Sequence, residues 1–210
     1  MSSTTLYRLS GIALLLGGGL SVIGTIGQLF NDNPLSALWI PMSLATAIGL
    51  LLVLLGLPAV YARQMKQAGM LGLIGFILFA LACLQFGGGS GLTDLVLLPL
   101  VTKSGGLNSA SIAFILYFLI VKLLLLAGSV VFGIATLRAG VLPKGSAILL
   151  LVGGVLFIVG GRVHIPYLDY FGEVLFFLSF IWLGTSLLSV TRREMEQEPA
   201  SMRAGTEVRA

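Results

Sequence analysis

Long apolar runs alternate with short polar breaks along the whole chain. A helix needs about 20 apolar residues to cross a bilayer at about 1.5 Å per residue. Runs of about that length occur six times, separated by charged residues or by Gly, Pro and Asn. Their approximate bounds are 9–30, 35–61, 68–87, 111–137, 145–161 and 167–190. The pattern predicts an all-α membrane protein in which residues 1–190 form a six-transmembrane-helix bundle.

The composition supports lipid as the surroundings. Of the 210 residues, 57% are hydrophobic and only 10% are charged, whereas a soluble domain carries roughly 25% charged residues. In water so much apolar surface would be left exposed, but lipid accepts it on helices that satisfy their own backbone hydrogen bonds. The lipid bilayer is therefore the first partner that we expect.

Three segments need separate interpretation. The first run follows Arg8 as a signal peptide would, but its 22 residues and the five similar runs after it favour a retained span. Residues 92–101 are too short to cross the bilayer, so this segment between the third and fourth helices is either interfacial or re-entrant. Residues 191–210 carry four Arg, four Glu and one Pro, which predicts a disordered cytoplasmic tail.

The distribution of Lys and Arg predicts the orientation, because cytoplasmic loops carry an excess of both. With the amino terminus inside, only Lys103 and Arg162 fall on the outer side, and Lys122 lies within a span. The other nine fall on the inner side: Arg8, Arg63, Lys66, Arg138, Lys144, Arg192, Arg193, Arg203 and Arg209. We expect both termini in the cytoplasm of a cell membrane protein. The asymmetry explains the net charge of +4 without a nucleic-acid partner.

Lys122 is the strongest single candidate for function. It lies about ten residues into the fourth span and therefore near the mid-plane, where an ammonium group is costly unless it faces water or a partner. At about 100° per residue, Ser111, Ser129 and Thr136 share its face. A polar stripe of this kind predicts a helix face turned toward a cavity or another helix.

Glu173 is the expected partner of this lysine, about 9 Å deep in the sixth span and on one face with Asp169. If the fourth and sixth spans touch, the lysine stem can reach the carboxylate. Two interpretations stay open at this point. The pair either fixes the structure, as an ion pair or a snorkelling lysine, or lines a functional cavity.

Further polar residues gather toward the outer half of the predicted bundle. They are Gln28, Asn31, Asp32, Gln85, Asp94, Arg162, His164 and Asp169. They form either solvated outer loops or an outward-open polar pocket whose floor is Lys122 and Glu173. Such a pocket would hold a small anionic or zwitterionic ligand, or relay protons.

The sequence argues against an enzyme. One histidine and one cysteine cannot supply a His/Cys metal cluster, and neither H-E-x-x-H nor a phosphate-binding loop occurs. We therefore expect no catalytic residue, no metal and no cofactor. Gly88 to Gly91 resembles the Gly-x-Ser-Gly motif of rhomboid proteases, but here the motif closes the third span, whereas the family's serine opens its fourth. Nothing around His164 resembles the family's Ala-His-x-x-Gly helix.

The chain has 28 glycines, mostly within the spans, where they allow helices to approach closely. Gly17, Ser21 and Thr25 repeat every four residues, and Gly69, Gly72 and Gly75 every three. These ridges predict helix contacts within the chain or with another copy or another subunit.

The segments Tyr7–Gly11, Gly56–Gln64 and Leu137–Lys144 resemble those of small uncharacterised bacterial six-span membrane proteins. The resemblance implies a bacterial cytoplasmic membrane and brings no known activity. The leading hypothesis is binding or transport of a small solute or ion through the outward-facing pocket with Lys122 and Glu173. The alternative is a non-catalytic accessory or scaffold subunit of a membrane complex, and an intramembrane enzyme ranks below both.

Overall fold

The computed structural model describes residues 3–31, 33–91, 93–103, 112–163, 165 and 167–207, which contain helices and no strand. The long helices are α1 (Ser3–Phe30), α2 (Trp39–Leu84), α4 (Ile112–Ala139), α5 (Lys144–Val163) and α6 (Leu168–Glu207). Between α2 and α4 lie two π-helical segments, η1 (Gln85–Ser90) and η2 (Thr93–Leu97), and the short helix α3 (Leu98–Lys103).

Five helices in the described part of the chain are long and apolar enough to cross a membrane. They are Thr5–Phe30, Trp39–Leu100, Leu116–Ala139, Lys144–Gly161 and Leu168–Ser189. The all-helical membrane class that the sequence predicts is thus confirmed at this level. The second of the five is 62 residues long, because it contains two of the predicted spans and the segment that follows them.

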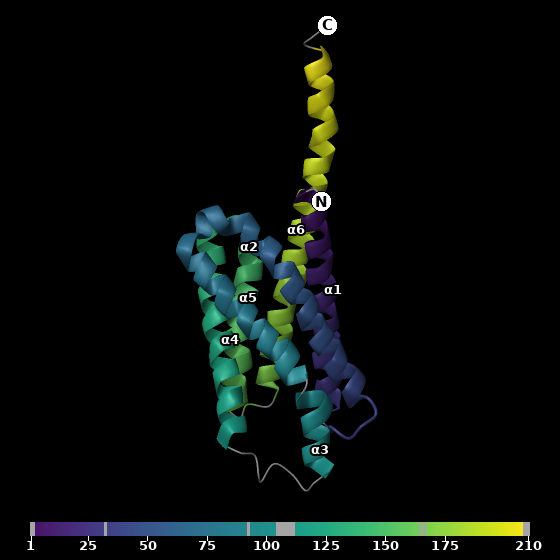
Figure 1. Cartoon of the computed structure of the whole chain (residues 1–210), viewed down its shortest axis with the longest axis vertical. Coiled ribbons are helices and arrows are strands. Elements are labelled where there is room, and N and C mark those ends of the chain that lie inside the picture. The colour runs from purple at the N-terminus through teal and green to yellow at the C-terminus, as the bar shows by residue number, and fades with distance from the viewer. Residues whose placement is uncertain are drawn as a thin grey trace.

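The helix α2 folds back on itself at Gly69. That residue has φ 56° and ψ −149°, a backbone conformation that only glycine adopts without strain. The ring of Tyr61 stacks on that of Phe76 with centroids 4.9 Å apart, whereas 15 residues of straight helix would separate them by about 22 Å. Two antiparallel arms, residues 39–68 and 70–84, therefore stand where the sequence predicts separate helices at 35–61 and 68–87 (Figure 1).

Both chain termini lie toward the same end of the bundle (Figure 1). This terminal end also holds the reversal at Gly69 and the turn at Gly140 between α4 and α5. The opposite end, called the distal end below, holds the loop after α1, the helix α3 and the start of α6. Successive helices run in alternate directions between the terminal and distal ends, in the order that the sequence predicts for the spans.

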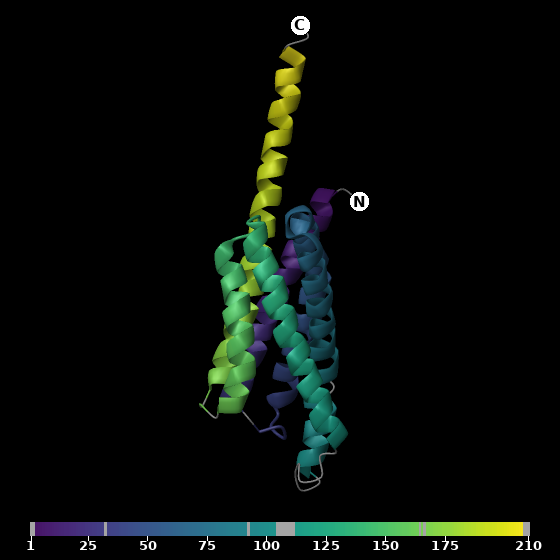
Figure 2. The same ribbon diagram turned by 90° about the vertical axis from the view of Figure 1, so that its left-hand side faces the viewer.

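Two segments outside the long apolar helices are also helical. Residues 191–207 continue α6 as a helix that projects from the bundle (Figure 2), where the sequence predicts a disordered tail. Its Arg, Glu, Gln, Met and Ala residues have high helix propensity. Residues 93–103 are helical as η2 and α3, and their placement along or within the membrane surface stays a prediction.

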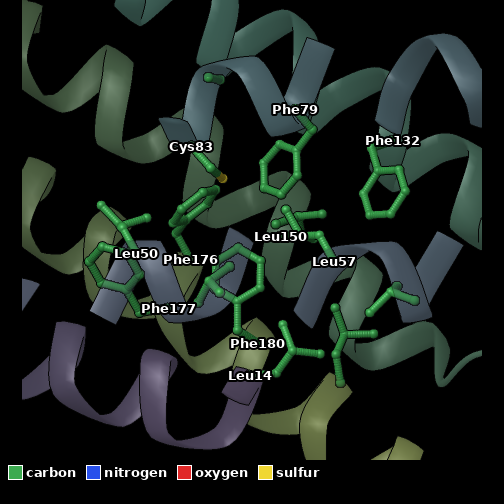
Figure 3. Packing of buried hydrophobic residues seen from close by; sticks show 14 of the residues in the cluster. Leu14, Leu50, Leu57, Phe79, Cys83, Phe132, Leu150, Phe176, Phe177 and Phe180 are labelled. Atoms are coloured by element: carbon green, nitrogen blue, oxygen red, sulfur yellow. The ribbon is translucent and has the colours of Figure 1, made fainter. Parts of the chain in front are cut away.

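The core is a cluster of phenylalanines contributed by three helices. The ring of Phe79, on the second arm of α2, lies 5.5 Å from that of Phe132 on α4 and 5.9 Å from those of Phe176 and Phe180 on α6. Phe177 completes the cluster, and all five side chains are 0–1% exposed. Figure 3 shows these rings packed above Leu14 of α1. The cluster fills the middle of the bundle between its two ends.

Glycines let α1 lie close against both of its neighbours. A Cβ atom at Gly17 would lie 2.6 Å from the carbonyl oxygen of Gly49 on α2, and one at Gly18 would lie 2.9 Å from that of Phe177 on α6. The predicted ridge therefore lies at a helix contact, and Ser21 continues it by donating to the carbonyl of Thr46 at 3.4 Å. Close approach replaces the hydrophobic effect as the source of helix association in lipid.

We expect Gly17→Ala to lower stability by about 1–3 kcal/mol, because the new methyl group must push α1 away from the backbone of α2. Gly19→Ala is the matched control, since a Cβ atom there meets nothing within 4 Å. Thermal unfolding of the two variants in detergent measures the difference. Equal melting temperatures would contradict the close packing of α1 on α2.

Candidate functional site

Glu173 is the one buried charged residue among those described, with only 7% of its surface exposed. It lies in the second turn of α6, which begins at Leu168 near the distal end. One turn further along the helix, Phe176 and Phe177 belong to the fully buried core. The carboxyl group therefore lies directly on the distal side of the phenylalanine cluster, within a helix of membrane-spanning length.

The polar group facing this carboxyl comes from another helix. It is the hydroxyl of Thr25 on α1, which is completely buried. Its Oγ1 atom has no hydrogen-bond partner of normal geometry within the described residues. A buried hydroxyl without a hydrogen bond of normal geometry is costly, and the carboxyl group of Glu173 is the polar group that faces it.

The polar contacts extend from Thr25 along the interface between α1 and α2. One turn beyond Thr25, the Nε2 atom of Gln28 donates to Oγ of Ser43 at 2.9 Å, and both side chains are buried. Ser21, Thr25 and Gln28 share one face of α1 at helical spacing. Thr25, Gln28, Ser43 and Glu173 together are called the distal polar cluster below.

Three charged side chains interact electrostatically with Glu173 from around this cluster. Two of them are carboxylates, Asp169 on the same helix and Asp94 on η2, and the third is Lys122 on α4. The indole Nε1 of Trp39 donates to the carbonyl oxygen of Asp94 at 2.7 Å, which ties η2 to the start of α2. Acidic groups thus outnumber basic ones around the buried carboxyl in the described part of the chain.

Lys122 and Glu173 do not form the predicted ion pair in the structure. Although both residues are described, no ion pair joins them within 4.0 Å. The reason is that α5 packs between α4 and α6, so the two helices do not meet as the pairing requires. The half-buried lysine instead places Nζ 3.6 Å from where a Cβ atom of Gly161 on α5 would lie.

The polar stripe on α4 is a packing face along most of its length. Seven residues from Lys122, the Oγ atom of Ser129 lies 2.6 Å from the Cβ position of Gly154, which is seven residues from Gly161 on the antiparallel α5. Near the terminal end, Nε2 of Gln64 on α2 donates to Oγ1 of Thr136 at 3.0 Å. Ser129 and Thr136 therefore mark helix contacts. Ser111, at the head of the stripe, falls outside the described residues.

The remaining predicted site residues are divided among several positions. Asp169 stands in the first turn of α6, where its Oδ1 accepts from the backbone N–H of Tyr170 at 3.0 Å. Gln85 begins η1 with an exposed side chain. Arg162 is in α5, but its side chain falls outside the described residues, as does the whole of His164. The structure thus brings Asp94 and Asp169 toward Glu173 and places Gln28 on Ser43, one turn beyond Thr25.

Sequence reasoning missed two members of the cluster, Thr25 and Ser43. Thr25 was assigned to a packing ridge, and Ser43 is an isolated polar residue in an apolar run. The spacing of Thr25 and Gln28 on one helix face is a signal that could have found the first of them. Nothing in the sequence indicates that Ser43 would lie opposite Gln28.

The distal polar cluster does not line the apolar groove on the surface. In the described residues, no group of three or more His, Cys, Asp or Glu side chains could hold a metal ion. A shallow groove of about 240 Å³ lies on α5 and is lined by Leu151, Val152, Val155 and Leu156. The chemistry available at the distal end is therefore that of a carboxyl group, hydroxyls and an amide.

No protein-family model, curated protein or solved structure matches this chain.

We expect Thr136→Val to lower stability by about 1–3 kcal/mol, because it leaves the buried amide of Gln64 without its acceptor. The double variant Gln64→Met with Thr136→Val should recover most of this loss, since both polar groups are then removed. Thr185→Val, at an exposed position, is the control. Denaturation of all three variants in detergent tests whether this part of the stripe is structural; an unchanged single variant would contradict it.

Proposed function

We propose that this protein is a six-span protein of the cytoplasmic membrane with both termini inside, and that it binds or transports a small solute or ion through the distal polar cluster. The reversal of α2 at Gly69 supports the six-span topology, because each arm then counts as one span. Arg63 and Lys66 lie near that reversal, and Arg8, Arg138 and Lys144 lie near the same end of other helices. Their clustering makes the terminal end the cytoplasmic one.

The topology predicts opposite labelling of cysteines at the two ends. In a Cys83→Ala background, cysteines replacing Lys66 and Lys144 should react with an impermeant maleimide only from the cytoplasmic side, and one replacing Lys103 only from the outside. The wild-type protein, whose single cysteine Cys83 is buried in the core, is the unreactive control. Labelling of positions 66 and 103 from one side would contradict the six-span order.

Burial of Glu173 is the observation that carries the functional proposal. Ionisable residues inside membrane helices are costly and are retained where they serve a solute or ion pathway. This carboxyl is 7% exposed, faces an unpaired hydroxyl of another helix and has no ion pair with Lys122 to explain it as a structural tie. The cluster lies toward the distal end of the bundle, which is the outer end in the proposed topology.

The phenylalanine cluster closes the path toward the cytoplasm. Phe79, Phe176 and Phe180 are completely buried and pack on one another directly beyond Glu173. In this conformation the packed rings separate Glu173 from the terminal end. Transport requires a second conformation in which these rings separate, as in alternating access around a fixed site.

We expect Glu173→Gln to reduce transport by about tenfold or more, because a hydrogen bond to a charged group contributes about 1.5–3 kcal/mol. The wild-type protein in liposomes is to be screened with jumps of protons, sodium, potassium and amino acids on a solid-supported membrane. Ser129→Ala and Glu194→Gln are controls that leave the cluster intact.

Two results would overturn the proposal. The first is that liposomes with wild-type protein show no more charge or solute movement than protein-free liposomes for any ion or amino acid tested. The other is full activity in Glu173→Gln. Stable co-purification of the silent protein with one membrane complex would then favour the accessory role.

A further inference from the structure

We propose that Glu173 binds and releases a proton, and that the Thr25 hydroxyl is its partner in both states. This inference rests on the proposed function and names the ion that the distal polar cluster takes. A hydroxyl can donate a hydrogen bond to a carboxylate, and it can accept one from a protonated carboxyl. The unpaired Oγ1 of Thr25, which faces the carboxyl, is therefore suited to either form.

The charges around Glu173 favour a cation over an anion. From α6 it faces Asp169, from η2 Asp94, and from α4 Lys122. The first helix contributes the neutral Thr25, and the side chain of Arg162 on α5 is outside the described residues. Among the described side chains, two carboxylates stand against one ammonium around the buried carboxyl, and this balance favours a cation.

The helix α2 adds no charge at this end. Its contributions near the cluster are the Ser43 hydroxyl and the indole of Trp39, while Arg63 and Lys66 lie beyond its middle, toward the reversal at Gly69. An ionised carboxylate in such apolar surroundings needs compensation by a bound cation or a bound proton. A single carboxyl group facing a hydroxyl is sufficient to hold a proton, so a proton is the cation that we propose.

Access for the proton is from the distal end. Asp169 lies four residues before Glu173, so the two carboxyl groups are on one face of α6, one turn apart. The side chain of Asp169 is half-buried, whereas Phe176 and Phe177 on the other side of Glu173 are fully buried. Asp169 is therefore the carboxyl group between Glu173 and the distal end, on the side from which we propose that the proton arrives.

Labelling with dicyclohexylcarbodiimide tests the proposal, because this apolar reagent adds to protonated carboxyl groups inside membranes. Wild-type protein in sealed vesicles of known orientation is treated over a range of outer pH values, and the modified residue is found by mass spectrometry. We expect a label at Glu173 that falls as the outer pH rises and does not respond to the inner pH. Glu173→Gln should lose it and Glu196→Gln should not.

The Thr25 variants separate a proton-binding partner from a packing residue. Thr25→Ser should retain the wild-type pH dependence of labelling, whereas Thr25→Val should change it while Glu173 stays labelled. An identical pH profile in Thr25→Val would show that the hydroxyl serves packing alone and would overturn its part in the proposal.

Three other results would overturn the proton site itself. They are absence of label at Glu173, label that does not depend on pH, and protection by sodium or potassium at constant pH, which would make a metal cation the ligand. The labelling needs no transport, so its outcome is separate from that of the flux measurements. If the wild type is labelled at Glu173 but Glu173→Gln still transports fully, the proposed function is refuted and the proposed proton site is not.

Discussion

The cost of burying a carboxyl group among apolar helices governs the distal half of this protein. Removing an ion from water costs several kcal/mol even after the surroundings relax, and Glu173 is 7% exposed without an ion pair to Lys122. The helices offset this cost only in part, through the Thr25 hydroxyl and the distant charge of the lysine. A bound proton would offset the rest, which is why we connect the site to function.

The fold brings these groups together through backbone contacts that glycines allow. Gly17 and Gly18 let α1 lie against α2 on one side and α6 on the other, and two turns further along α1 the Thr25 hydroxyl consequently faces α6. On the far side of α6, Gly153 of α5 lies so close to the backbone of Phe176 that a Cβ atom at the glycine would clash with the phenylalanine nitrogen. Small residues thus set the positions of the helices, and the helices set the surroundings of the carboxyl.

Much of the architecture could be predicted from hydropathy, because the length of an apolar run is a local property. The runs at 35–61 and 68–87 correspond to the two arms of α2, and the break between them falls at Gly69. The helical extension at 191–207 was not predicted, since its charges and proline resemble those of a disordered tail. The Arg, Glu, Gln, Met and Ala residues of the segment favour a helix, whereas Pro199 opposes one.

The site was harder to predict, because it depends on which helices are neighbours. Helical periodicity placed Lys122 and Ser129 on one face correctly, but it could not show that this face packs on Gly161 and Gly154 of α5. The expected partner, Glu173, was identified as important for a reason that the structure does not support. Its partner is a threonine on the first helix, and no spacing within one helix reveals a contact between α1 and α6.

The central claim is that Glu173 changes its protonation while it remains in the membrane. Infrared difference spectra between low and high pH, recorded on the wild type and on Glu173→Gln in lipid, test it most directly. We expect a protonated-carboxyl band in the wild-type difference spectrum that is missing from the spectrum of the variant. Identical difference spectra for the two proteins would contradict the account.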